Sequence, residues 1–90
     1  MKTLLEIIDT TGEPNNLNMY KQTINVRKQV GRQLKGKRKG LKLSMYEVSK
    51  RAEITADTVK AIESGTVSGQ LDNITRICII LRIEQLIITI

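Results

Sequence analysis

Apolar residues recur at helical spacing in the first half of the chain. Val26, Val30 and Leu34 lie four residues apart, which places them on one face of a helix predicted over residues 25–39. Lysines and arginines occupy much of the remaining surface of this helix. Gly40 is expected to end it, because glycine commonly follows the last turn of a helix.

Two shorter helices are predicted after this one. Ser44 with Glu47 three residues later is a capping box, in which each residue satisfies a free backbone donor of the other, and it predicts a helix over residues 45–52. Thr55 is a second N-cap residue, and the helix that it starts is expected to end near Glu63, before Gly65. Only residues 53 and 54 separate the two helices.

A fourth helix is predicted over residues 71–81. Its inward-facing stripe is expected to contain the residues that recur at three- and four-residue spacing, namely Leu71, Ile74, Ile77, Cys78 and Leu81. Ile79 and Ile80 lie outside that stripe, so this helix has apolar surface that needs further cover.

The two ends of the chain have the character of strands. Residues 3–8 favour β structure, residues 10–16 form a loop rich in Gly, Pro and Asn, and residues 83–90 alternate as a strand does. A single strand is not stable, so the two segments are expected to pair, either within one chain or between two copies. The chain thus divides into an N-terminal arm and loop over residues 1–22, a helical domain over residues 23–82, and a C-terminal strand over residues 83–90 that serves dimerisation.

The composition points to a small domain with a polyanionic partner. Ninety residues suffice for one domain of marginal stability. Tyr20 and Tyr46 are the only aromatic residues, so the core must consist of Ile, Leu, Val and Met. The net charge is +6, and residues 22–65 contain eleven bases against four acids. Because the positive charge is concentrated in one segment, we expect a polyanion such as nucleic acid to bind there.

Several classes of protein are disfavoured by what the sequence lacks. A lone cysteine, Cys78, cannot form an internal disulfide, so we expect a cytoplasmic protein with Cys78 as a small core residue. The chain has no histidine, metal-ligand spacing, phosphate-binding glycine loop or nucleophile motif, so no enzyme activity, catalytic residue, metal or cofactor is expected. The longest apolar run has five residues, far fewer than the roughly 20 of a membrane span, so no membrane is expected as a partner.

The two short predicted helices fit a known DNA-binding arrangement. Two helices joined by a tight turn form a helix-turn-helix, whose second helix enters the major groove of DNA. Ser49 is small where the two helices must approach closely, and Val48 and Val59 supply apolar contacts between them. DNA binding is therefore the first functional expectation.

A longer set of residues agrees with this expectation. These residues fall into three groups along the chain. The first group is Val30-Gly31, Leu34, Arg38 and Leu43-Ser44; the second is Ile54-Thr55, Val59 and Ile62-Glu63-Ser64-Gly65; the third is Leu71, Ile74, Ile77 and Leu81. This set resembles the lambda-repressor/Cro-type helix-turn-helix domains, often called the XRE family. The resemblance runs from Val30 to Leu81 without a gap, and as a set these motifs are specific.

The resemblance implies both a fold and a set of contacts. The implied fold is mainly α, a lambda-repressor-like domain of four to five helices with short terminal β-strands. Arg38 and Glu63 correspond to a structural ion pair between the first and third helices. The implied groove-facing positions are Thr55, Ala56, Asp57, Thr58, Lys60 and Ala61, and Ser44 and Met45 correspond to positions near the phosphate backbone.

The chain departs from the family at some of these positions. Met45 replaces the usual Gln, which removes a phosphate and base contact, and it suits the core equally well. Glu53 replaces the turn glycine, where a positive φ costs a non-glycine residue roughly 1 kcal/mol. Ala56 and Ala61 stand where Gln or Arg is frequent, and alanine can touch a thymine methyl group but cannot donate a hydrogen bond.

The predicted function is that of a sequence-specific double-stranded DNA-binding transcriptional regulator, expected to be a repressor that acts as a homodimer. The residues expected to contact DNA are Arg32, Lys35, Lys37, Lys39, Lys42, Ser44, Met45, Tyr46, Thr55, Ala56, Asp57, Thr58, Lys60, Ala61 and Ser64. The alternative is a protein-interaction module, such as the antitoxin of a toxin–antitoxin pair, whose terminal strands bind the toxin by β-pairing. An antitoxin that also binds DNA would satisfy both hypotheses.

Overall fold

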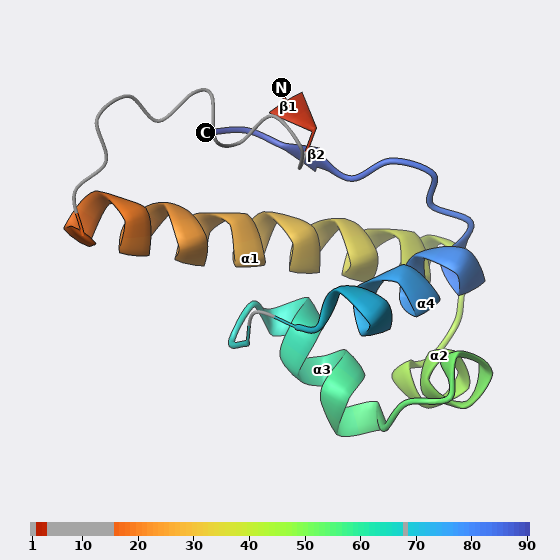
Figure 1. The fold of residues 1–90 in the computed structure, drawn as a ribbon. Helices are drawn as coiled ribbons and strands as arrows, with labels where there is room; N and C mark the ends of the chain where they lie inside the picture. The colour runs from red at the N-terminus through yellow and green to blue at the C-terminus, as the bar shows by residue number, and fades with distance from the viewer. Residues whose placement is uncertain (1, 4–15, 68) are drawn as a thin grey trace.

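One long helix lies between the remaining helices and a short pair of strands. The structure is a computed structural model and describes residues 2–3, 16–67 and 69–90. Its elements are β1 (Lys2–Thr3), α1 (Asn16–Gly40), α2 (Met45–Ala52), α3 (Ala56–Ser64), α4 (Leu71–Leu81) and β2 (Ile87–Ile88). In Figure 1, α2, α3 and α4 lie on one side of α1, and the two strands lie on the other. The described residues are therefore mainly helical, as predicted.

The first helix begins earlier than its apolar pattern predicted, at Asn16 rather than at residue 25. Met19 and Tyr20 are exposed in this added part, so they do not continue the buried face of the helix. Extending an existing helix is inexpensive, because each added residue gains one hydrogen bond after the costly first turn has formed. Of the predicted strand over residues 3–8 and the loop over residues 10–16, only Thr3 and Asn16 are among the described residues.

The ends of the later helices are set by the capping residues that the sequence contains. The Ser44 hydroxyl accepts from the Glu47 N–H at 3.0 Å, and the Glu47 carboxylate accepts from the Ser44 N–H at 3.2 Å, which completes the predicted capping box. The Thr55 hydroxyl accepts from the Thr58 N–H at 3.1 Å, and Gly65 ends α3 in the left-handed region with φ 75°. The predicted bounds of α2, α3 and α4 are thus confirmed to within a residue.

A single aliphatic core joins all four helices and β2. It consists of Val30, Leu34, Val48, Val59, Ile62, Ile77, Leu81 and Ile88, with Ala52 buried beside it. One predicted core residue is wrong: the Leu71 side chain is 71% exposed. Leu71 is the first residue of α4, and the helix reaches the core only at Ile74, one turn later.

Gly31 is the point of closest approach between α1 and α3. A Cβ atom on Gly31 would lie 2.3 Å from the Glu63 carbonyl oxygen and 2.7 Å from that of Ile62. Real Cβ atoms do not come this close to backbone, so any larger residue would push α3 away from α1. The absence of a side chain at this position therefore fixes how α3 sits against α1.

Two glutamine side chains of α1 bind the C-terminal strand. The Gln33 amide donates to the Ile87 carbonyl at 2.6 Å and accepts from the Ile87 N–H at 2.9 Å. Gln29 makes the same pair of bonds with the N–H and carbonyl groups of Thr89. Four residues of helix rise about 6 Å and two residues of strand rise about 6.7 Å, so the two spacings match. The other edge of β2 pairs antiparallel with β1, Lys2 opposite Ile88.

This arrangement is one of the two pairings that the sequence left open. In the structure the terminal segments pair within one chain, and Ile88 is completely buried against the helices. The ladder covers two residues rather than the predicted residues 83–90.

Candidate nucleic-acid interface

The bihelical corner expected from the sequence is formed by α2 and α3. Ser49 of α2 is buried, and its hydroxyl donates to the Tyr46 carbonyl at 2.7 Å, so the polar group is satisfied inside its own helix. The turn passes through Glu53, which has φ 59° and ψ 42°. This is the left-handed conformation in which the resemblance implied a glycine. The chain therefore makes this turn with a non-glycine residue, for which the left-handed conformation is energetically unfavourable.

The outer face of α3 is open to solvent. Asp57, Lys60 and Ser64 are exposed along it, and Thr55 is exposed just before its first turn. Ala56, Thr58 and Ala61 are only half-buried, although α3 also supplies Val59 and Ile62 to the core. The predicted groove-facing residues thus lie on a surface that a duplex could reach. Of the six predicted groove-facing residues, Thr55, Thr58 and Lys60 have a side chain that can donate a hydrogen bond.

The hydroxyl groups on this helix make hydrogen bonds within the protein, although the Thr55–Thr58 contact uses one of its two O–H donors. The Thr55 and Thr58 hydroxyl oxygens are 2.7 Å apart, and Thr55 also caps the helix. The Ser64 hydroxyl donates to the Ala61 carbonyl at 3.0 Å. Lys60 and Asp57 are therefore the charged groups of α3 that remain available to an incoming ligand.

A row of bases follows one face of α1 next to this surface. Its members recur at seven- and four-residue spacing and are all exposed: Lys21, Lys28, Arg32, Lys35 and Lys39. We call them the basic row. Lys28 places the row beside the C-terminal end of α3, because a Cβ on Gly65 would lie 3.0 Å from the Lys28 Cγ atom. Residues seven apart on a helix share a face, so Lys35 lies on that side as well.

Two of the predicted basic contacts lie elsewhere. Lys37 is four residues after Gln33, and the series Gln29, Gln33, Lys37 runs along the side of α1 that faces β2. Lys37 is thus separated from Lys35 and Lys39 by the width of the helix. Lys42 is exposed in the turn between α1 and α2, with φ 60°. Lys21 and Lys28, in contrast, belong to the basic row but were not predicted; their heptad spacing with Lys35 is the signal that could have identified them.

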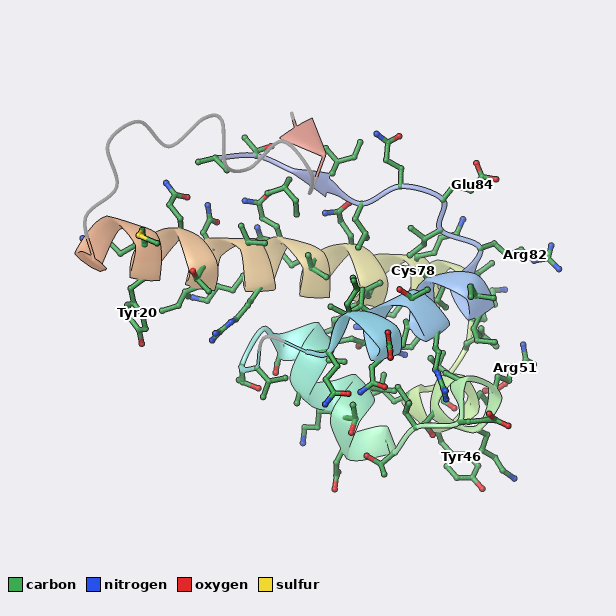
Figure 2. All side chains as sticks on the ribbon, in the orientation of Figure 1. Tyr20, Tyr46, Arg51, Cys78, Arg82 and Glu84 are labelled. Atoms are coloured by element: carbon green, nitrogen blue, oxygen red, sulfur yellow. The ribbon has the colours of Figure 1, made fainter. Side chains whose placement is uncertain are left out.

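The start of α2 offers less to a duplex than the resemblance implied. Ser44 is occupied in the capping box, and Met45 is half-buried and packs against the core. Tyr46 is 61% exposed, and the Lys50 ammonium lies 5.3 Å from the centre of its ring. Figure 2 shows Tyr46 and Tyr20 at opposite ends of the molecule, so the two rings cannot form one stacking surface.

An ion pair between α1 and α3 lies behind this surface. The Arg38 Nε donates to one Glu63 oxygen at 2.7 Å and Nη2 donates to the other at 3.0 Å, a two-point contact with both side chains buried. Nη1 donates to the Leu43 carbonyl at 2.8 Å, which ties the turn before α2 to the same group. The hydrogen bond with Glu63 raises the pKa of Arg38 above its ordinary value, although burial alone would lower it. The pair named from the resemblance thus joins α1, α3 and the α2 turn.

Other kinds of site are not seen in the described part of the chain. Its His, Cys, Asp and Glu residues do not gather in groups of three that could hold a metal ion. Cys78 is half-buried next to the core, and burial raises the pKa of its thiol above the ordinary value. No helix within the described residues combines the length and apolar character that a bilayer-spanning segment needs.

Comparison with protein-family models, with curated proteins and with solved structures finds no match to this chain.

Proposed function

We propose that the protein binds double-stranded DNA through α2 and α3, with α3 in the major groove, and acts as a transcriptional regulator. The observation that supports this most directly is the exposed outer face of α3 at a helix-turn-helix corner, next to the basic row of α1. An α-helix fits the major groove, and adjacent bases on the same protein bind the phosphates that border it. The proposed fold relationship is to the lambda-repressor/Cro-type domains.

The basic row supplies the proposed phosphate contacts. Lys28 and Lys39 are eleven residues apart, or about 16 Å along the helix. One DNA strand has a phosphate for every 3.4 Å or so of duplex axis, so this length spans several phosphates. Exposed lysines and arginines on one face can follow such a backbone without reading its sequence. The row therefore provides affinity rather than specificity.

Base recognition is proposed to depend on few groups. Lys60 can donate to a guanine, and Asp57 can accept from a cytosine amino group, whereas Ala56 and Ala61 can only contact thymine methyl groups. One such helix reads too few base pairs for a unique operator, so we propose a homodimer. Ile79 on α4 is 68% exposed, and Ile80 beside it is half-buried, which makes this face of α4 the surface we propose for the second copy.

The direct test is a binding titration of the full chain with a pool of random duplexes, repeated over a range of salt concentrations. We expect Lys35→Ala to weaken binding to every duplex equally and to lower the slope of log affinity against log salt by about 1. Lys37→Ala is the matched control, because Lys37 lies on the β2 side of the same helix, and we expect it to leave the slope unchanged. Lys60→Ala should change which duplexes are selected.

Two results would count against the proposal. Absence of duplex binding at low salt would refute it and would favour the protein-interaction hypothesis. Equal effects of the Lys35 and Lys37 substitutions would show that binding depends on total charge rather than on this surface. Sedimentation of Ile79→Lys tests the dimer separately: the substitution should leave the fold intact and produce a monomer.

A further inference from the structure

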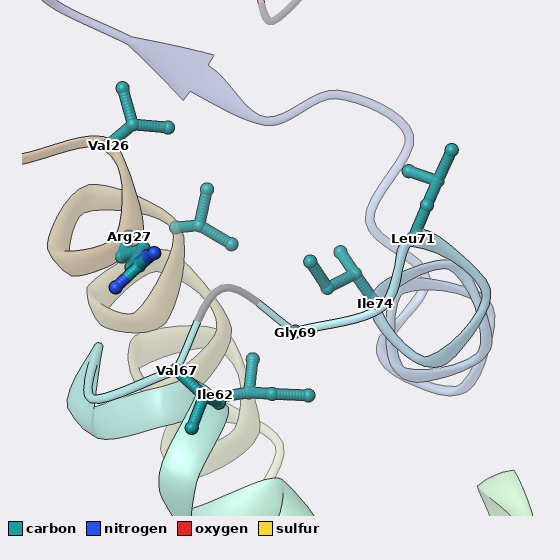
Figure 3. A pocket seen from close by; sticks show the side chains of 8 residues that line it. Val26, Arg27, Ile62, Val67, Gly69, Leu71 and Ile74 are labelled. Atoms are coloured by element: carbon teal, nitrogen blue, oxygen red, sulfur yellow. The ribbon is translucent and has the colours of Figure 1, made fainter. Parts of the chain in front are cut away.

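A cavity of about 190 Å³ lies between α1, α3, α4 and the connection from α3 to α4. Figure 3 shows the eight residues that line it, and all but two have aliphatic side chains. They are Val26, Arg27, Val30, Ile62, Val67, Gly69, Leu71 and Ile74. No acidic residue is among them, so the charged group that the described residues bring to the cavity is a cation.

The Arg27 side chain is incompletely bonded at this place. Its Nε atom is buried and has no hydrogen-bond partner in the described part of the chain. A buried donor of a charged group is costly to leave unpaired, and native proteins rarely do so without a reason. Residues 2–3, 16–67 and 69–90 supply no acceptor for this donor, so a bound ligand could supply one.

The exposure of Leu71 is a second, independent observation at the same cavity. The apolar pattern of α4 placed Leu71 in the core, yet its side chain is 71% exposed while it borders this space. Val67 on the opposite lip is 42% exposed. An aliphatic chain in the cavity would give both residues apolar contact beyond that which the described residues provide.

We propose that this cavity is a binding site for a short aliphatic carboxylate, held by Arg27 through its carboxylate and by the aliphatic lining through its chain. The volume corresponds to roughly six groups of the size of a water molecule or a methylene, so the six carbons of hexanoate fill it and the two carboxylate oxygens lie at Arg27. A neutral ligand would leave the guanidinium without a counter-charge. A phosphate or a dicarboxylate would place further charge against aliphatic walls, which is unfavourable.

The position of the site suggests what binding would affect. Ile62 belongs to α3, and Val67 and Gly69 belong to the segment that leaves it, so a ligand here contacts the helix whose outer face we propose for DNA. The carboxylate would then act as an effector of that binding. The site itself does not depend on the proposed function, because it is tested by direct binding in the absence of DNA.

The experiment is an NMR titration of the isotope-labelled full chain with hexanoate, with hexan-1-ol and with acetate. With about eight non-hydrogen atoms, hexanoate should bind with a dissociation constant near 1 mM or below and should shift the backbone signals of Ile62, Val67 and Ile74 in a saturable manner. Hexan-1-ol has the same chain without the charge and should bind at least about tenfold more weakly. Acetate has the charge without the chain and should not saturate these signals.

The Arg27→Met variant tests the role of the guanidinium. It should weaken hexanoate binding by about tenfold to a hundredfold, whereas Arg32→Met, on the solvent side of the same helix, should not. The urea midpoint of ligand-free Arg27→Met should equal or exceed that of the unaltered protein, because an unpaired buried donor is removed. A purely structural arginine would instead lower it.

Three results would overturn the proposal: equal binding of hexanoate and hexan-1-ol, shifts that do not saturate at about ten times the expected dissociation constant, or unchanged hexanoate affinity in Arg27→Met. If Arg27→Met does not fold, the comparison of the two six-carbon ligands on the unaltered protein decides the question alone.

Discussion

The strongest prediction for stability concerns the ion pair between Arg38 and Glu63. Both residues are buried, and three hydrogen bonds leave the guanidinium: two to the carboxylate and one to the Leu43 carbonyl. Removing one partner leaves the other charged and out of contact with water, which typically costs about 3–5 kcal/mol. A domain of this length has a total stability of roughly 5–13 kcal/mol, so either single substitution should remove a large part of it.

The assay is equilibrium unfolding in urea, followed by circular dichroism. We expect Glu63→Met and Arg38→Met each to lower the free energy of unfolding by about 4 kcal/mol, which corresponds to a fall in Tm of at least about 16 °C. The double variant Arg38→Met with Glu63→Met should be more stable than either single variant, because a pair of apolar side chains can replace a buried ion pair at little cost.

The matched control is the exposed ion pair between Arg76 and Glu53, whose charged atoms are 3.9 Å apart. Arg76→Met should change the free energy of unfolding by less than about 1 kcal/mol, as exposed pairs contribute little. The reasoning is refuted if Glu63→Met costs no more than this control. It also fails if the losses of the two single variants simply add in the double variant, since the residues would then not be coupled.

Three further predictions follow from the backbone and from Cys78. Gly31→Ala should lower the free energy of unfolding by about 3 kcal/mol, because its Cβ would collide with the Glu63 carbonyl. Gly36→Ala is the control: its Cβ meets nothing within 4 Å, so the free energy of unfolding should rise by about 0.5–1 kcal/mol. Urea unfolding of the two variants separates the effect of packing from that of helix propensity. Glu53→Gly should raise the free energy of unfolding by about 0.5–1 kcal/mol in the same assay, because glycine adopts the left-handed turn without strain. A lower free energy of unfolding would show that the Glu53 side chain stabilises the turn by more than this strain. Burial raises the pKa of the Cys78 thiol, so the reactive thiolate forms only at higher pH. Alkylation by iodoacetamide should therefore be slower in the native protein than in urea, and the pH profile of the alkylation rate should be displaced to higher pH. Equal rates in the two states would contradict this. Because the folded pKa is the higher one, the contribution of Cys78 to stability is present at neutral pH and is lost as the pH rises toward and through that value.

The parts of the fold that could be predicted from the sequence depend on neighbouring residues. The capping box at Ser44, the Thr55 cap and the Gly65 stop act within one turn, so the bounds of α2 and α3 follow from the residues themselves. The buried positions of α1 and α4 followed from spacing in the same way. The prediction that Leu71 is buried was wrong, because residue spacing indicates which face of a helix a residue lies on but not how far along the helix the neighbouring elements extend.

The parts that could not be predicted depend on distant residues. Nothing near Gln29 or Gln33 in the sequence indicates that they bind a strand more than fifty residues later. For the same reason Lys37 was grouped with Lys35 and Lys39, although the strand defines a second side of α1 on which Lys37 lies. The charge of the candidate surface was predictable, whereas its division between two sides of one helix was not.

The glutamine pair also has a consequence for how this protein can meet other chains. An open strand edge is a template on which another polypeptide can add, and it favours aggregation. Here the N–H and carbonyl groups of Ile87 and Thr89 are already bonded to α1, and β1 holds the opposite edge. A protein that docks by contributing a strand must first displace either β1 or the side-chain amides of Gln29 and Gln33 on α1. At Ile87 to Thr89 this protection should therefore disfavour edge-to-edge association of copies of the chain.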